Sequence, residues 1–168
     1  MKIIIKEYSD EWPKLFDLER SQLIETLKDP STLIEHIGST AVEGLSAKPV
    51  IDIIIGLPDF RIANDYIKKI SGLGYEYISR FEDVMPYRRF FIKESSGIRT
   101  HHIHMVEAGS EFWFRHLAFR DYLSANENTR NEYQVLKKKL SEKEWKDGNE
   151  YNAAKTEFIK GIEANFTF

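Results

Sequence analysis

Short apolar runs and longer apolar stripes alternate along the first half of the chain. The segment KIIIKEY (2–8) predicts a short strand, and TLIEHIG (32–38) is a second strand candidate that stops at a glycine. PVIDIIIGL (49–57) is apolar at nearly every position, which is typical of a strand inside a sheet. These three segments predict a β-sheet in the N-terminal part of the protein.

Two segments of the same half space their apolar residues as a helix does. SDEWPKLFDLERSQLIETLKD (9–29) can be capped by Ser9 or Asp10, and Pro13 fits its first turn. DFRIANDYIKKISGLGY (59–75) follows the apolar strand and ends in two glycines. The predicted inward stripes are Leu15, Leu18, Gln22, Leu23 and Leu27 in the first helix, and Ile62, Tyr66, Ile67 and Ile70 in the second.

The second half begins with a hairpin pattern and then becomes helical. YRRFFIKE (87–94) and IRTHHIHMVE (98–107) are strand candidates joined by SSG. Three helix-like segments follow, at 111–126, 127–143 and 149–166. Because strands come first and helices last, the predicted class is an α+β domain with a helical C-terminal region.

Length and composition are those of one ordinary globular domain. A chain of 168 residues, of which 42% are hydrophobic and 30% charged, needs no cross-link or metal to fold. We therefore expect a single domain over residues 1–168. Its sheet core should reach to about residue 108, and its helical part should begin at about residue 111.

Charge and cysteine content narrow the chemistry. The chain has no cysteine, so any metal must bind to His, Asp or Glu. A net charge of −3 argues against a protein held mainly by nucleic-acid backbone, but it allows a small anionic ligand in a locally basic pocket. No apolar run reaches the roughly 18 residues of a membrane span, and the first residues are charged too soon for a signal peptide. We therefore expect a cytoplasmic protein without a membrane partner.

One carboxylate interrupts the apolar segment VIDIII (50–55). In a strand, Asp52 shares a face with Val50 and Ile54, while the adjacent isoleucines point to the other face. A buried unpaired carboxylate is costly, so Asp52 needs a cation, a metal ion or several hydrogen-bond donors. It is either a catalytic group that the strand carries into a cleft or a buried structural acceptor.

Two histidines stand on one face of the segment THHIHMVE (100–107). His102 and His104 are two positions apart, so both imidazoles project from the side opposite to Ile103 and Met105. Such a pair can share one metal ion or donate to an anion, but this short pattern also arises by accident as two surface histidines. The apolar pair is expected to face the core, and the histidine pair a cleft or solvent.

Small and basic residues near these strands can serve an anion. The turn Gly38-Ser39-Thr40 can point backbone N–H groups at a phosphate, although a plain helix cap by Ser39 or Thr40 is the simpler interpretation. Lys48, Arg88 and Arg89 near the strands could line an anion pocket, and Arg115, Arg120 and Lys155 in the helical part could reach back toward the sheet. Each is also compatible with a solvated position, and the run Lys137–Lys139 predicts a solvated helix face.

An ordered set of motifs resembles one known family. EHIGSTAVEGLSAKPVIDI, RRFF, HHIHMV, FRDYL and YNAAKTEFI occur in that order, and together they resemble the GrpB family from about Trp12 to the C-terminus. That family is regarded as a branch of the nucleotidyltransferase fold shared with DNA polymerase β. The resemblance therefore implies a nucleotidyltransferase-like mixed sheet with flanking helices, and it implies a fold more than a reaction.

The superfamily pattern implies roles for individual residues. Gly38 and Ser39 match its phosphate-binding turn, and Asp52 matches its first metal-binding carboxylate. Its second carboxylate falls at Ile54 and is missing, and the later strand that would carry the third offers two histidines instead. One aspartate and two imidazoles suit zinc, manganese or iron better than magnesium, and they can equally form a metal-free anion site.

Three functions remain open from the sequence. The first is a transferase-type enzyme acting on a nucleotide or other phosphorylated small molecule, with Asp52, His102 and His104 both as catalytic groups and as ligands of a divalent metal ion (Mg²⁺, Mn²⁺ or Zn²⁺). The expected phosphate- and substrate-binding residues are Gly38, Ser39, Lys48, Arg89 and Lys155. The second is a nucleotide- or anion-binding module that lost catalysis with the carboxylate at position 54. The third is a single-metal hydrolase with an activated water.

Overall fold

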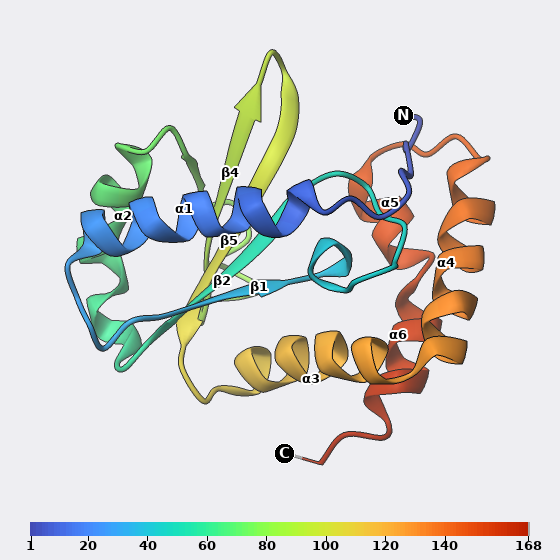
Figure 1. The fold of residues 1–168 in the computed structure, drawn as a ribbon. Helices are drawn as coiled ribbons and strands as arrows, with labels where there is room; N and C mark the ends of the chain where they lie inside the picture. The colour runs from blue at the N-terminus through green and yellow to red at the C-terminus, as the bar shows by residue number, and fades with distance from the viewer. Residues whose placement is uncertain (168) are drawn as a thin grey trace.

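The computed structural model describes residues 1–167 and is built around one five-stranded sheet (Figure 1). The strands are β1 (Leu33–Ile37), β2 (Ile51–Leu57), β3 (Glu76–Ile78), β4 (Arg89–Ser95) and β5 (Ile98–Glu107). Their order across the sheet is β1-β2-β5-β4-β3. Strands β2 and β5 run parallel and the other neighbours are antiparallel, so the sheet is mixed and the predicted α+β class is confirmed.

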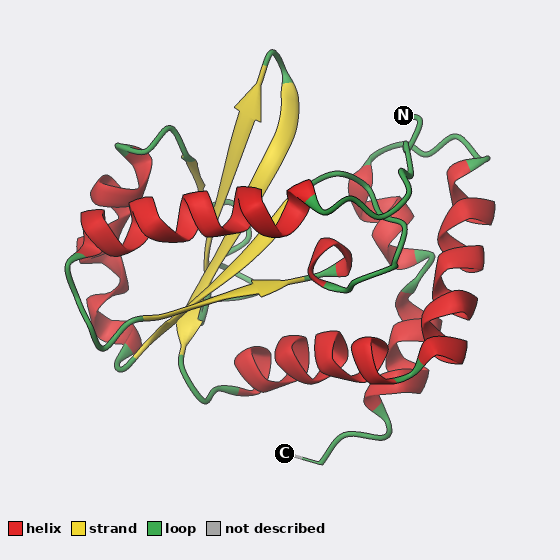
Figure 2. Ribbon diagram, in the orientation of Figure 1, coloured by secondary structure: helices red, strands yellow, loops and turns green. Residues whose placement is uncertain are grey.

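Helices flank this sheet and make up the C-terminal region (Figure 2). They are α1 (Glu11–Leu27), α2 (Ala63–Ser71), α3 (Glu111–Ala125), α4 (Glu127–Ser141), α5 (Gly148–Ala153) and α6 (Thr156–Glu163), with short 3₁₀ turns η1 (Ser39–Ala41) and η2 (Phe60–Ile62). Figure 1 shows α3 leading away from β5 toward α4, α5 and α6, which stand together on one side of the sheet. Within residues 1–167, none of the helices has both the length and the apolar character that a membrane crossing requires.

One face of the sheet packs under α1 and α2. Ile53 and Ile55 of β2 and Ile103 and Met105 of β5 have no exposed surface in this core. Burial of each such side chain contributes about 1.5–3 kcal/mol to the free energy of unfolding. The prediction that Ile103 and Met105 face the core, away from the histidines, is confirmed.

The opposite face is only partly covered, by the start of α3. Ile54, Ile37 and Val106 pack there against Phe112 and Trp113. Further along, the loop after η1 shares a second cluster with α3, α4 and α6. These shared contacts support the expected single domain, which stays a prediction, and they leave one end of this face open beside Asp52.

The N-terminal strand prediction is wrong. Residues 2–8 form only two isolated bridges, Lys2 with Glu144 and Lys6 with Ala47, and they do not join the sheet. The apolar residue Ile3 is instead buried against Leu140 and Tyr151 of the helical region. The apolar N-terminal segment therefore packs against the C-terminal helical region and does not extend the sheet.

The inward stripe of α1 is turned relative to the prediction. Leu15 and Leu18 are 42% and 57% exposed, and the buried residues are Trp12, Phe16, Glu19, Leu23 and Leu27. Two large aromatic side chains therefore set the buried face. Glu19 can join it because it accepts hydrogen bonds from Tyr75 and Lys93.

Two further elements differ from the sequence prediction, one helix and one strand. The segment 149–166 forms two helices, α5 and α6, because its two halves pack into different clusters. Tyr151 packs with Ile3 and Leu140, whereas Ile162 packs with Leu123 and Tyr133. The three-residue strand β3 was not predicted, since a strand this short carries no clear alternation. It pairs with β4 at the edge of the sheet.

Candidate functional site

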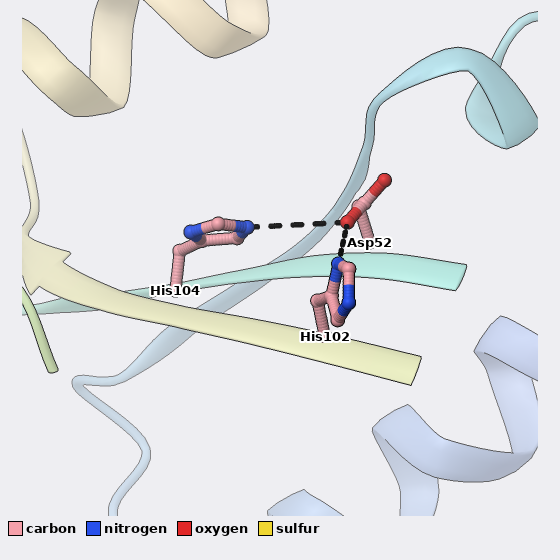
Figure 3. Close-up of side chains that lie close together, drawn as sticks. All are labelled: Asp52, His102 and His104. Carbon is pink, nitrogen blue, oxygen red and sulfur yellow. Dashed lines mark hydrogen bonds and ion pairs between the residues drawn. The ribbon is translucent and has the colours of Figure 1, made fainter. Parts of the chain in front are cut away.

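Asp52 and the two histidines meet because β2 and β5 are neighbouring parallel strands. In the register of this pair, Asp52 lies opposite His102 and Ile54 lies opposite His104. Figure 3 shows the three polar side chains on one side of these strands, pointing toward one another. Asp52 and His102 are 50 residues apart in sequence, so the strand pairing alone brings them together.

The distances place three ligand atoms around one point. His102 Nδ1 donates to Asp52 Oδ1 over 2.9 Å, and His104 Nε2 lies 3.9 Å from the same oxygen. One ligand atom from each residue lies within 4.8 Å of the others. Ligand atoms about 2.1 Å from one ion stand roughly 3.0–3.4 Å apart, so small side-chain shifts would allow the three to share an ion. Their side chains remain 28%, 19% and 15% exposed.

Burial and hydrogen bonding act in opposite directions on Asp52. Desolvation raises the pKa of its carboxyl, but the hydrogen bond from His102 and the interactions with the His102 and His104 imidazoles lower it by more, so the net pKa lies below the usual range. Desolvation lowers the pKa of His104, and the nearby carboxylate opposes this only in part. At neutral pH the site therefore holds an ionised carboxylate beside a neutral His104 imidazole.

The turn before η1 places its backbone against Asp52. Gly38 has φ +73° and ψ −173°, a conformation that essentially only glycine adopts, and a Cβ atom there would stand 2.6 Å from Asp52 Oδ2. Thr40 Oγ1 donates to Val50 O over 3.3 Å, which holds the turn against the residue that precedes β2. Within the described residues, no helix begins after Thr40 in the segment 41–45, and no side chain caps η1, so the helix-cap interpretation of Ser39 and Thr40 is wrong. The glycine is needed for close approach to the carboxylate.

A cavity of about 530 Å³ opens over this group. Its walls come from η1, from β2, β4 and β5, from the loop at 79–88, and from α4 and α5. The basic residues that line it are Lys48, Arg80, Arg88, Arg99, Lys137 and Lys155, and the acidic ones are Asp52 and Asp147. The cavity is therefore locally basic, although the whole chain has a net charge of −3.

Most of these basic residues have no acidic partner within the described part of the chain. Arg99 lies 3.6 Å from Glu94, whereas the other five have no carboxylate of residues 1–167 within 4.0 Å. Desolvation lowers the pKa of both Lys48 and Arg88. Partly buried cations without a counter-charge are costly, and an anionic ligand in the cavity would relieve that cost.

Two of the lysines belong to the helical region. Lys137 is 2% exposed, donates to Ser46 O over 2.5 Å and lies 4.7 Å from the ring centroid of Tyr133. The prediction of a solvated Lys137 is therefore wrong. Its spacing from Tyr133 and Leu140 puts it on the buried stripe of α4, a signal that the run of three lysines masked. Lys155 lies 4.4 Å from the ring centroid of Tyr151.

We expect the folded protein to become more stable as pH rises from about 7 to about 10. Desolvation lowers the pKa of Lys137 to about 7 and that of Lys155 to about 8. An unfolded lysine has a pKa of about 10.4, so between these values the unfolded state binds more protons and rising pH favours folding. Urea unfolding at several pH values will measure the slope.

The slope should be shallower in Lys137→Met than in the parent. Lys139→Met is the matched control, because Lys139 belongs to the same run but is exposed. It should keep the parental slope. Equal slopes in both variants would show that Lys137 titrates as an ordinary lysine in the folded state.

Arg89 does not join the cavity. Its side chain lies on the other face of β4 and donates to Asn64 Oδ1 over 3.0 Å, whereas Arg88 lines the cavity. Side chains alternate along a strand, so two adjacent arginines cannot face the same site. The pairing of Phe90 with His104 decides which faces the cavity, because Arg88 shares the face of Phe90.

Two other basic candidates also lie outside. Arg115 pairs with Glu163 at 3.5 Å, and Arg120 pairs with Glu35 at 2.8 Å. In contrast, Gly38 and Ser39 lie at the site, and Lys48 and Lys155 line the cavity, so their phosphate-binding role stays a prediction. Sequence reasoning missed Arg80 and Arg99, since a loop and the start of a hairpin strand give no periodic signal.

Comparison with known proteins identifies the family. The family profile described as GrpB protein matches residues 2–165, which is nearly the whole chain. This chain belongs to the GrpB family. The resemblance noted from its motifs is thereby confirmed, and the Asp52–His102–His104 geometry becomes a feature of one GrpB protein.

Relatives in several bacteria cover most of the chain. UPF0157 protein YqkA of Bacillus subtilis is 37% identical over 164 residues, covering 98% of this chain but 47% of YqkA, so this chain spans about half of that relative. Glutamate-rich protein GrpB of Alkalihalophilus pseudofirmus is 34% identical, with 96% of this chain and 94% of that protein covered. The crystal structure of conserved protein GrpB from Enterococcus faecalis superposes with a TM-score of 0.85 at 34% identity, covering 96% and 95% of the two chains.

More distant structures share the fold alone. A cytoplasmic RNA terminal U-transferase superposes with a TM-score of 0.54 at 15% identity, covering 78% of this chain and 40% of that one. Cid1 in complex with its short product ApU gives 0.53 at 16% identity, covering 79% and 42%. The nucleotidyltransferase-like fold expected from the sequence is thus confirmed.

Proposed function

We propose that this GrpB protein binds a nucleotide or another phosphorylated small molecule in the basic cavity and acts on it by a nucleotidyltransferase-type reaction with a divalent metal ion. The observation that carries the proposal is the pairing of one ionised carboxylate with a surrounding set of basic residues. Asp52 stands at the cavity with His102 and His104, and five of the six basic lining residues lack an acidic partner within residues 1–167.

Phosphate is the anion that this lining suits best. The cavity offers both guanidinium groups, which can hold two phosphate oxygens at once, and ammonium groups, which act as point charges. Lys48, Lys137 and Lys155 stand on the side of η1 and the helices, and Arg88 stands on the β4 side. A ligand with several phosphate charges could contact both sides, whereas a single carboxylate would leave most of the cations unpaired.

The donor set fits one divalent ion, of a type that accepts nitrogen. Asp52 would hold the ion together with an imidazole nitrogen of the adjacent histidine pair, which favours Mn²⁺ or Zn²⁺ over Mg²⁺. Ile54 cannot supply a second carboxylate, and it is fully buried against Phe112 and Trp113. When bound, the ion would neutralise phosphoryl charge and polarise a phosphoryl oxygen.

The residues of the chain would position the phosphate. We infer that Gly38 and Ser39 bring backbone N–H groups to its oxygens, because the turn is pressed against Asp52 and Ser39 lines the cavity. Lys48 and Lys155 would balance its charge. Arg88 takes the role that the sequence assigned to Arg89, since Arg89 faces the other side of β4.

Thermal unfolding of tag-free protein tests this proposal. A nucleoside triphosphate with Mn²⁺, at about 100 times its Kd, should stabilise the fold by about 2.7 kcal/mol, a rise in Tm of roughly 5–10 °C. The matching nucleoside without phosphates should produce no rise. Equal stabilisation by the nucleoside, or no shift with either ligand at millimolar concentration, would contradict phosphate recognition.

The binding-module alternative rests on Ile54. In that case the triphosphate still raises Tm, but ³¹P NMR of the mixture with Mn²⁺ and a range of hydroxyl acceptors shows no new phosphorus signal. Appearance of pyrophosphate together with a nucleotidylated product supports the transferase. Appearance of a nucleoside monophosphate in the absence of an acceptor supports hydrolysis.

A further inference from the structure

Of the two histidines beside Asp52, only His104 has a second hydrogen-bond partner among residues 1–167. Arg88 Nη1 lies 3.3 Å from His104 Nδ1 and forms a hydrogen bond with it. A guanidinium group has donors and no acceptor, so His104 Nδ1 must be the acceptor in this contact. His104 therefore carries its proton on Nε2, the nitrogen that faces Asp52 and the cavity.

This proton position conflicts with metal binding by His104. A histidine that ligates a metal through Nε2 must carry its proton on Nδ1, where a carboxylate or carbonyl usually accepts it. Here that proton would point at the donating guanidinium of Arg88. The contact thus favours an Nε2–H group that donates into the cavity.

The His104 ring is held in this orientation by its surroundings. Its centroid lies 5.0 Å from that of Phe90, 5.8 Å from that of Phe112 and 6.2 Å from that of His116. The Arg88 guanidinium carbon lies 4.8 Å from the centroid of Phe90, so the guanidinium and the His104 imidazole both pack against the same phenyl ring. Turning the ring by a half rotation would replace both contacting nitrogens with carbons and lose both contacts.

His102 is not constrained in this way. Its Nδ1 faces only the Asp52 carboxylate, at 2.9 Å, and its Nε2 has no hydrogen-bond partner among the described residues. Within residues 1–167, no Arg or Lys side chain hydrogen-bonds to either nitrogen. An incoming ion can therefore displace the Nδ1 proton and be shared between His102 and Asp52, with release of that proton.

We propose that His104 is a hydrogen-bond donor to a phosphoryl oxygen and not a metal ligand, that Arg88 is the positioning residue that sets this role, and that Asp52 and His102 hold the ion. This assignment rests on the proposed function. It gives Asp52 and His102 the role of metal ligands and His104 the role of a phosphate-binding donor. The Nε2–H of His104 is 3.9 Å from Asp52 Oδ1, too far for a hydrogen bond, so it is available to an oxygen of a bound phosphate.

The proton position can be observed without any ligand. In ¹⁵N-histidine-labelled protein, long-range ¹H–¹⁵N spectra distinguish protonated from unprotonated ring nitrogens. The chain has five histidines, and loss of signals in single variants assigns each. His104 should show a protonated Nε2 and an unprotonated Nδ1, and Arg88→Met should release it to a mixture of forms. A protonated Nδ1 on His104 in the parent would overturn the proposal.

Metal and phosphate binding give the second test, with Mn²⁺ and inorganic tripolyphosphate as probes. In His104→Ala and His104→Gln, Mn²⁺ affinity measured by electron paramagnetic resonance should stay within about threefold of the parent. In the matched variant His102→Ala it should fall at least about tenfold. Metal-free tripolyphosphate binding should fall about tenfold in His104→Ala and recover in His104→Gln, because the glutamine amide restores a donor.

The outcomes separate this inference from the proposed function. If the parent binds neither Mn²⁺ nor tripolyphosphate, the proposed function fails, and the spectra still decide the proton position of His104. If the parent binds both and His104→Gln loses Mn²⁺ as strongly as His102→Ala, His104 is a metal ligand and only the division of roles fails. Thermal melts of each variant verify that it is folded.

Discussion

Asp52→Asn should lower the affinity for Mn²⁺ at least about 100-fold while leaving the protein folded. Loss of a group that only supports a metal ligand typically costs about 10–100-fold, so loss of the charged ligand itself should cost more. The charged residues that remain in the cavity are six basic ones and Asp147, so without Asp52 the lining repels a cation. Titration calorimetry with MnCl₂ measures the change. Metal-free tripolyphosphate should bind as tightly as before or more tightly, because the variant removes a negative charge.

Asp147→Asn is the matched control for this substitution. It changes the same charge in the same cavity, and Asn can retain the cap that Asp147 provides to α5 by accepting from Asn149 N and Glu150 N. We expect its Mn²⁺ affinity to resemble that of the parent. A similar loss in both variants would mean that the overall field of the cavity, and not coordination by Asp52, governs metal binding.

Ligand binding by a destabilised alanine variant separates a functional from a purely structural role of Asp52. Asp52→Ala leaves His102 Nδ1 without its acceptor, which should cost about 1–3 kcal/mol, and Asp52→Asn should cost less because an amide oxygen can accept. If Asp52 were only a structural acceptor, both variants would melt lower and bind Mn²⁺ and tripolyphosphate like the parent. That result would remove Asp52 from the site.

Gly38→Ala should destabilise the protein by at least about 2 kcal/mol, a fall in Tm of roughly 4–8 °C. Two causes act together. The backbone at Gly38 has φ +73° and ψ −173°, which a side chain tolerates poorly, and the new Cβ would stand 2.6 Å from Asp52 Oδ2. The turn or the carboxylate must move, so Mn²⁺ affinity should fall with stability. Chemical denaturation and MnCl₂ titration measure the two effects.

Gly97→Ala is the matched control for Gly38→Ala, because it introduces the backbone strain without a contact to Asp52. Gly97 has φ +75°, but a Cβ atom there meets nothing within 4 Å. It should therefore lose only the roughly 1–2 kcal/mol that a left-handed conformation costs an L-residue, with unchanged Mn²⁺ affinity. If Gly38→Ala lost no more stability than Gly97→Ala and bound Mn²⁺ normally, the turn would not position Asp52.

Position 54 is filled by a buried apolar side chain. Where the resemblance led us to expect a second carboxylate, this chain has an isoleucine that is fully buried with Phe112 and Trp113 at the start of α3. Trp113 also sits so close to β2 that a Cβ atom at Gly56 would stand 2.6 Å from its ring. The helix thus occupies the space next to Asp52 along β2, and a buried unpaired carboxylate there would be strongly destabilising.

Local periodicity in the sequence determined which face of its own strand each site residue occupies. The alternation in 49–57 and 98–107 is a property of consecutive side chains, so it separated Asp52 from Ile53, and His102 and His104 from Ile103, before any pairing was known. The order of GrpB-like motifs likewise determined the fold, because it implied the mixed sheet that β2 and β5 form.

Only the tertiary structure decided which faces meet. Periodicity places a side chain relative to its own helix or strand, and contacts between distant segments depend on register and packing that no local window contains. The register of β4 on β5 turned Arg88 toward His104 and Arg89 away from it, and the packing of α4 buried Lys137 at the cavity. The proton position of His104 follows from that same long-range contact, since the donor that requires it, Arg88, is 16 residues away in sequence and directly precedes β4.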